Sequence, residues 1–323
     1  MRRLVRRGTA FLAICALFLS AASPAVAGPR FKEFPTPSPD SRPNDIIAGP
    51  DGALWFTESS SNNIGRITTT GDFTEYPIPT PASGPFDITV GPDGALWFSE
   101  QYGDKIGKIT TSGVLTEYPL PYEISIPEGI TSGPDGALWF TESYGNKIGR
   151  ITTAGGVTEY PLPYPKRSPS GIAVGADGAL WFTEQGANKI GRITTSGTVT
   201  GEYPIPTYNS APFGITRGSD GNLWFTEDTG DKIGRITTSG VVTGEFPTPT
   251  PEGEPWGITA NRNGTLWFSE RSGNRIGQIT TAGVIRESAP RPGSGPAGIT
   301  GGPDGNIWFT EEDGSGIAAF RLL

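Results

Sequence analysis

Seven glutamates stand at the same place in a repeated motif, and a ring of carboxylates could hold a cation. The motif reads GPDGALWFTE at Gly49–Glu58 and again at 133–142. Its closing residue recurs at Glu58, Glu100, Glu142, Glu184, Glu227, Glu270 and Glu311. Carboxylate oxygens suit Ca²⁺ or Mg²⁺, but a catalytic group is rarely needed seven times. Most copies carry a Lys or Arg a few residues later (Lys105, Lys147, Lys189, Lys232, Arg275). We therefore expect each glutamate to support the fold, either by pairing with this cation or by accepting backbone hydrogen bonds in its loop.

Residues that could recognise a ligand stand where the copies differ. Each copy opens with a lead-in motif, Pro-x-Gly-Ile or Pro-x-Asp-Ile. The residue at the lead-in position x is Asn44, Phe86, Glu128, Ser170, Phe213, Trp256 or Ala297. Other variable residues follow the glutamates. Aromatic and polar groups that converge on one opening are typical of a binding site. The predicted binding residues are Phe86, Tyr102, Glu128, Tyr144, Phe213, Trp256 and Arg271. For Trp256, ligand contact and a plug that packs the opening both stay open.

The set of available bases is short, because the chain contains no histidine and one cysteine, Cys15. A Ser-His-Asp mechanism is therefore excluded. Carboxylates, lysine and tyrosine remain as possible bases. Glu128 is the one acidic residue at a lead-in position, so it is the candidate base if burial raises its pKa, and otherwise it is a solvated acid.

The elements that must position these residues follow from the repeat period. Tryptophan recurs at steps of 42, 42, 42, 43, 43 and 41 residues, a period typical of propellers. Gly and Pro interrupt the chain every few residues and β-branched residues fill the intervals, which excludes helices. From Gly171 one copy reads as four short strands, GIAVG, ALWFTE, KIGRIT and GEYPIP. The sequence predicts an all-β, seven-bladed β-propeller of four-stranded antiparallel blades.

The two ends of the chain predict how the ring closes. The last copy stops after GIAAFRLL and has no fourth strand. The segment KEFPTPSP near the start (32–39) matches the fourth-strand text GEFPTPTP at 244–251. We expect the N-terminal strand to complete the last blade, because this pairing would remove an exposed sheet edge.

The first 27 residues have the pattern of a secretory signal peptide. A basic start with four arginines precedes a short apolar run and Ala25-Val26-Ala27. We expect cleavage after Ala27 and a secreted or periplasmic protein, with Sec and twin-arginine export both open. The predicted domains are a signal peptide, 1–27, and a single propeller, 28–323.

Composition excludes several classes of partner. The formal charge is −8 and falls to −12 without the four signal arginines, which argues against nucleic-acid binding. No second apolar stretch is long enough to span a membrane. We expect a monomer stabilised by core packing, with a small molecule, a glycan or a protein as its ligand at the channel mouth.

The motifs GPDGALWFTE, NKIGRITT and TEYPLP resemble those of the virginiamycin B lyase family over essentially the whole mature chain. The resemblance implies seven blades and a magnesium-assisted elimination that opens the ring ester of a streptogramin B antibiotic, a resistance activity. It implies a histidine base in a Pro-His-Gly lead-in of the last blade and a second histidine one blade earlier. Here these positions carry Ala297 and Trp256, and the position of one metal-binding carboxylate carries Gly295.

Two hypotheses remain. The first is a binding propeller without the histidine-dependent elimination. The second is a metal-assisted lyase or lactonase that uses a carboxylate base. If a metal is bound, Mg²⁺ or Ca²⁺ would be held by Glu311 and Glu312, the carboxylates of the last blade.

Overall fold

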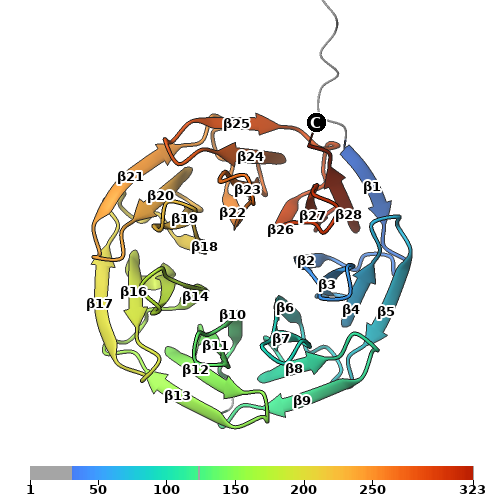
Figure 1. The fold of residues 1–323 in the computed structure, drawn as a ribbon, viewed down its shortest axis with the longest axis horizontal. Helices are drawn as coiled ribbons and strands as arrows, with labels where there is room; N and C mark the ends of the chain where they lie inside the picture. Colours follow the sequence, from blue (N-terminus) through green and yellow to red (C-terminus); the bar gives the residue numbers. More distant parts are fainter. Residues whose placement is uncertain (1–30, 123, 323) are drawn as a thin grey trace, which may run out of the picture.

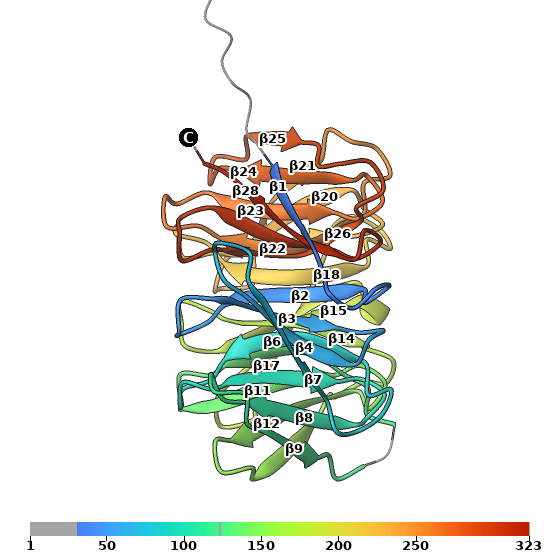
Figure 2. The same cartoon turned by 90° about the vertical axis from the view of Figure 1, so that its right-hand side faces the viewer.

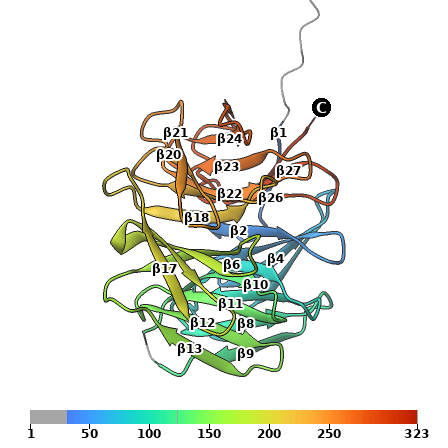
Figure 3. The ribbon, with the colours of Figure 1, turned by 60° about the vertical axis from the view of Figure 1, so that its left-hand side comes forward.

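The computed structural model describes residues 31–122 and 124–322, and these form a ring of seven four-stranded antiparallel sheets around a central channel (Figure 1). The predicted fold is confirmed. Side and oblique views show the ring as a disc (Figures 2 and 3), and β17 lies on its rim (Figure 1). The predicted signal peptide lies outside the described residues. Within the described part of the chain, no helix is long and apolar enough to cross a membrane.

Each blade runs from the channel to the rim through four strands. The innermost strands are β2 (Pro43–Ala48), β6 (Pro85–Val90), β10 (Pro127–Ser132), β14 (Pro169–Val174), β18 (Pro212–Arg217), β22 (Pro255–Ala260) and β26 (Pro296–Gly301). The second strands are β3 (Leu54–Glu58), β7 (Leu96–Glu100), β11 (Ala137–Glu142), β15 (Leu180–Glu184), β19 (Leu223–Glu227), β23 (Leu266–Glu270) and β27 (Ile307–Glu311).

The outer half of each blade follows the same order. The third strands are β4 (Asn63–Ile67), β8 (Lys105–Ile109), β12 (Lys147–Thr152), β16 (Lys189–Ile193), β20 (Lys232–Ile236), β24 (Arg275–Ile279) and β28 (Gly316–Phe320). The rim strands are β5 (Phe73–Pro77), β9 (Leu115–Pro119), β13 (Val157–Pro161), β17 (Val199–Pro204), β21 (Val242–Pro247), β25 (Ile285–Ser288) and β1 (Phe31–Pro35). A single 3₁₀ turn, η1 (Gln185–Ala187), lies among the described loops. We number the blades 1 to 7 from β2–β5 to β26–β28 with β1.

The second strand of each blade carries the core. All five residues of β3 are buried, because each blade packs between two neighbours and both faces of the strand meet apolar side chains. At the seam between blades 1 and 2, Trp55 of one blade packs with Leu96 and Phe98 of the next. The rim strand β5 mixes exposed and half-buried residues, and its proline falls at the strand end, where no ladder donor is needed.

The ring closes as the chain ends predict. Strand β1 pairs antiparallel with β28, with Phe31 opposite Phe320 and Pro35 opposite Gly316. Phe34 is buried and stacks on Trp308, with ring centroids 5.4 Å apart. This strand takes the place of the fourth strand that the last copy lacks, so the two ends of the described chain lie in one blade (Figure 1).

Candidate functional site

Aromatic side chains from three blades meet at the mouth of the channel. In every innermost strand the pairing register shifts between the lead-in proline and the isoleucine three residues later. Such a bulge re-aims the residues within it. Phe213 stacks on Trp256 with centroids 3.5 Å apart and meets Phe86 edge to face at 6.2 Å. The three half-buried rings line a cavity of about 140 Å³.

A charged group borders this aromatic cluster. The side chain of Glu312 lies between Arg42 and Arg271, and each guanidinium is 2.8 Å from one of its oxygens. Arg271 also lies over the Trp256 ring, 4.9 Å from its centroid. A second cavity of about 290 Å³ runs beside these groups and includes Tyr102 in its lining. The mouth thus offers apolar surface next to a cationic edge.

The predicted binding residues divide into two groups. Phe86, Phe213 and Trp256 line the first cavity, and Tyr102 and Arg271 line the second, which shares Phe86 and Trp256 with it. Glu128 and Tyr144 line neither.

Glu128 is held by a neighbouring blade. Its Oε2 accepts a hydrogen bond of 2.6 Å from the Ser170 hydroxyl, and burial raises its pKa. Glu128 nevertheless keeps partial exposure, so the interpretations as a base and as a solvated acid both stay open. Tyr144 is 71% exposed and lies in the loop between β11 and β12.

The last blade's two acidic residues have cationic partners. Glu311 is fully buried, and one oxygen lies 3.3 Å from an Arg291 nitrogen. Burial raises the pKa of Glu311 to about 7. Both oxygens of Glu312 are taken by arginines, which would repel a divalent cation. Among the described residues, no three acidic, His or Cys side chains form a metal-binding group. The residues present therefore do not fit the magnesium ion that the resemblance implies.

Two acidic residues in the channel were missed by the sequence reasoning. Asp45 and Asp87 stand where the other five lead-ins carry glycine, and both line the first cavity. Asp45 accepts a hydrogen bond from the Ile88 amide and Asp87 accepts one from the Ile130 amide. Burial raises the pKa of both carboxyls, and the charge of Asp45 raises that of Asp87 further. The Gly-to-Asp change in two adjacent copies was the available signal.

The lysines predicted to pair with the repeated glutamates in blades 2 to 4 have other partners, so that part of the prediction is wrong. Lys105 binds Glu117 of the rim strand at 3.2 Å instead of Glu100. Both oxygens of the fully buried Glu100 lack a hydrogen-bond partner among the described residues. Burial raises its pKa to about 8, and the nearby charge of Glu117 adds to the shift. Lys147 and Lys189 likewise bind rim glutamates, since the rim carboxylate is more accessible to a lysine than the buried one.

Comparisons with known proteins agree on one family. The family model described as "Virginiamycin B lyase family" matches residues 23–243. A structure of a streptogramin B lyase is 43% identical, covers 91% of this chain and 98% of its own, and superposes with a TM-score of 0.87. No curated protein sequence matches the chain.

Two further solved structures come from Staphylococcus aureus. A virginiamycin B lyase is 45% identical over 91% of this chain and all of its own, with a TM-score of 0.87. A catalytically inactive histidine-to-alanine variant of that lyase, with quinupristin, has the same identity and coverage and a TM-score of 0.86. The chain therefore belongs to the virginiamycin B lyase family.

Proposed function

We propose that this protein is a ligand-binding propeller that lacks the histidine-dependent elimination of its relatives. Its ligand has an apolar or stacking face and lies on Phe86, Phe213 and Trp256 at the channel mouth. A macrocyclic peptide such as a streptogramin B fits this description, and a glycan or a protein side chain are the other ligands of that shape. We further propose that residues 1–27 direct export, with cleavage after Ala27.

One observation carries the proposal. A relative in which a single histidine is replaced by alanine is catalytically inactive, and its structure contains quinupristin. Binding in that protein therefore survives the loss of the histidine. The present chain contains no histidine anywhere in its 323 residues. Loss of a positioned general base costs about 10²–10⁴ in rate.

The geometry of the mouth supports binding as the remaining activity. Three aromatic rings are half-buried rather than fully buried, so part of each ring faces the opening. Arg42 and Arg271 share the Glu312 carboxylate, so charged groups that could orient a ligand stand beside the rings. Aromatic and arginine side chains are the residues that most often dominate binding energy.

The second candidate is a lyase or lactonase with a carboxylate base. The observation that favours it is the pair of carboxyls Asp45 and Asp87, which line the same cavity as the aromatic rings and whose pKa values are raised by burial. Glu128 is the weaker base candidate, because it does not line the cavity and its Oε2 accepts a hydrogen bond from Ser170. This function would need no metal at Glu311 and Glu312, where arginines lie.

Calorimetric titration with quinupristin and virginiamycin B, followed by chromatography and mass spectrometry of the recovered compounds, tests both candidates. The proposal predicts saturable binding and unchanged compound. Elimination would give a product of the same mass at a new retention time, and hydrolysis a product heavier by one water. Tyr208→Ala is a matched control, because Tyr208 is 95% exposed and lies in neither mouth cavity.

A further inference from the structure

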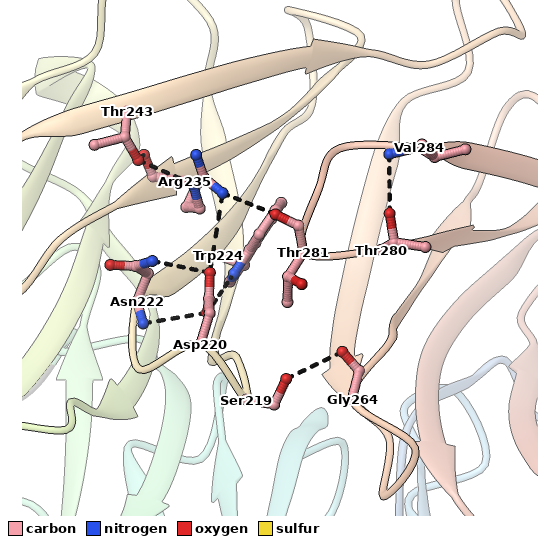
Figure 4. A network of polar contacts seen from close by, with 10 residues as sticks. All are labelled: Ser219, Asp220, Asn222, Trp224, Arg235, Thr243, Gly264, Thr280, Thr281 and Val284. Carbon is pink, nitrogen blue, oxygen red and sulfur yellow. Dashed lines mark hydrogen bonds and ion pairs between the residues drawn. The ribbon is translucent and has the colours of Figure 1, made fainter.

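Six of the seven core tryptophans have the same two partners. The indole Nε1–H donates to an aspartate four residues earlier at 3.0–3.1 Å in blades 1 to 5 and 7. A rim-strand tyrosine or phenylalanine stacks on the same indole at 5.4–5.6 Å. In blade 5, Asp220 accepts from Trp224 and lies beside Arg235, whose guanidinium also reaches the Thr281 carbonyl of blade 6 (Figure 4).

Blade 6 has lost every part of this arrangement. Asn263 replaces the aspartate, Gln278 replaces the basic residue of the third strand, and Ser288 replaces the stacking ring. Asn261 replaces a glycine at which, in blade 1, a Cβ would collide with the indole of Trp55. The Trp267 indole therefore cannot occupy the place that its counterparts take.

The consequence is an open groove with an unused donor. Trp267 is 4% exposed, and its Nε1–H has no hydrogen-bond partner among the described residues. The groove has a volume of about 450 Å³ and runs between blades 6 and 7. Phe320 of blade 7 lies against one side of the indole at 5.1 Å, tilted by 54°. A buried indole N–H normally finds a partner, so an orphan one that lines a groove indicates a ligand.

On the face of blade 6 that carries Trp267, the basic residue stands on the fourth strand, β25, and not on the third strand as in blade 1. Trp267, Gln278 and Arg286 are directly paired across β23, β24 and β25, so their side chains share one face. Blade 1 carries threonine at the position of Arg286. Arg286 is exposed, and no carboxylate pairs with it within residues 31–122 and 124–322. Glu287 also borders the groove, but both its oxygens accept from Thr250.

We propose that the groove at Trp267 is a second binding site, separate from the channel mouth, for a planar ring that carries a carboxylate. The ring takes the stacking place that Ser288 leaves open. An oxygen of the ligand accepts from the Trp267 Nε1–H, and the guanidinium of Arg286 offsets the negative charge. The site uses none of the mouth residues and does not depend on the function proposed for the mouth.

Titration of ¹⁵N-tryptophan-labelled protein with benzoate and 4-hydroxyphenylacetate, followed by the indole N–H resonances, tests this site. We expect one resonance, identified by its loss in Trp267→Phe, to shift in a saturable way. Ser288→Tyr restores the ring of the other blades and should weaken binding at least tenfold. Arg286→Thr should weaken binding of both anions several-fold and leave the neutral probe p-cresol unaffected.

A matched variant in blade 5 tests whether an open stacking place binds the anions when the indole N–H already has a partner. Phe246→Ser opens the same place there but leaves the Trp224 indole bonded to Asp220, so we expect no anion binding at blade 5. The proposal is overturned if the Trp267 resonance does not respond, if Ser288→Tyr leaves binding unchanged, or if Phe246→Ser binds equally well. It is also overturned if the protein forms a dimer in which the Trp267 indole is already protected, because a second copy would then be the occupant.

Discussion

The blade seams and the channel mouth are built from the same seven copies of sequence, yet they differ in almost every respect. At the seams a tryptophan, a buried glutamate and a rim glutamate recur from blade to blade. At the mouth the equivalent position holds residues as different as Phe86, Glu128, Ser170 and Trp256. Both sets lie on strands of nearly identical register. The strands therefore fix where a side chain stands, and the mouth tolerates more variation in the side chain than most of the seams do.

Blade 6 extends this comparison to the seam itself. Its tryptophan is still buried, but Asn261, Asn263, Gln278 and Ser288 replace the four residues that contact the tryptophan in other blades. A seam that departs from the repeat in four places resembles the mouth more than the other seams. Such a departure is the same kind of signal that singled out the mouth.

The largest effect should come from breaking the ring. Deletion of Phe31–Pro35 from the 28–323 protein removes five paired residues and the buried ring of Phe34. Loss of one buried phenylalanine side chain alone costs about 3–5 kcal/mol, and the deletion also exposes an edge of β28. We expect aggregation or a fall in Tm of many degrees in a thermal melt. An unchanged Tm would mean that β1 does not close the blade.

The mouth should respond in binding more than in stability. Trp256→Ala removes the ring that stacks on Phe213 and lies under Arg271. We expect binding of quinupristin to weaken by about 1–3 kcal/mol, as for an interface anchor. The free energy of unfolding should change by less, because the ring is half-buried.

Paired melting and titration of Trp256→Ala would decide between the two interpretations of this residue. A loss of about 3–5 kcal/mol in stability with unchanged binding is the result for a plug. That result would move the binding site away from the aromatic cluster.

The buried glutamates should make the seams sensitive to pH. The pKa of Glu100 is raised to about 8 by burial and by Glu117, against an unfolded value near 4.5. Folding therefore takes up protons between these values, so the free energy of unfolding falls as pH rises from about 5 to about 8. Glu100→Gln should remove its share of this dependence and stabilise the protein by about 1–2 kcal/mol at pH 8. Denaturant titrations of both proteins at about pH 5 and pH 8 measure the free energy of unfolding. An identical pH dependence in Glu100→Gln would contradict the raised pKa of Glu100.

The smallest effect is expected at Glu128. Its carboxylate is bonded to Ser170 and lines neither mouth cavity. Glu128→Gln should leave quinupristin affinity within about twofold of the starting protein, a difference well under 1 kcal/mol. A loss of tenfold or more in calorimetry would place this residue in the binding site after all.

The fold was predictable because its signals are local and repeated. The tryptophan spacing determined the number of blades, and the match between 32–39 and 244–251 determined the closure. The site was predictable only in part. Phe86, Phe213 and Trp256 were recognised as departures from the repeat, whereas their contact across the channel depends on ring curvature, which no single copy encodes.

The partners of charged residues were the least predictable feature. Lys105 follows Glu100 closely in sequence but bonds to Glu117, because the rim carboxylate is reachable and the buried one is not. The sequence reasoning did not predict Asp45 and Asp87, because a motif written as Pro-x-Gly/Asp-Ile hides the difference between the two copies with Asp and the five copies with Gly. Such pairs depend on depth within the blade, and sequence distance does not report depth.

The central claim is that the protein binds a streptogramin B without converting it. The most direct test is to incubate the purified protein with a streptogramin B in the presence of Mg²⁺ and to analyse the compound by chromatography and mass spectrometry. Binding is measured in parallel. The account predicts that the compound is bound at the mouth, that binding weakens by about 1–3 kcal/mol in Trp256→Ala, and that the recovered compound is intact. A ring-opened product of the same mass, formed at a rate comparable to that of a streptogramin B lyase assayed alongside, would contradict it.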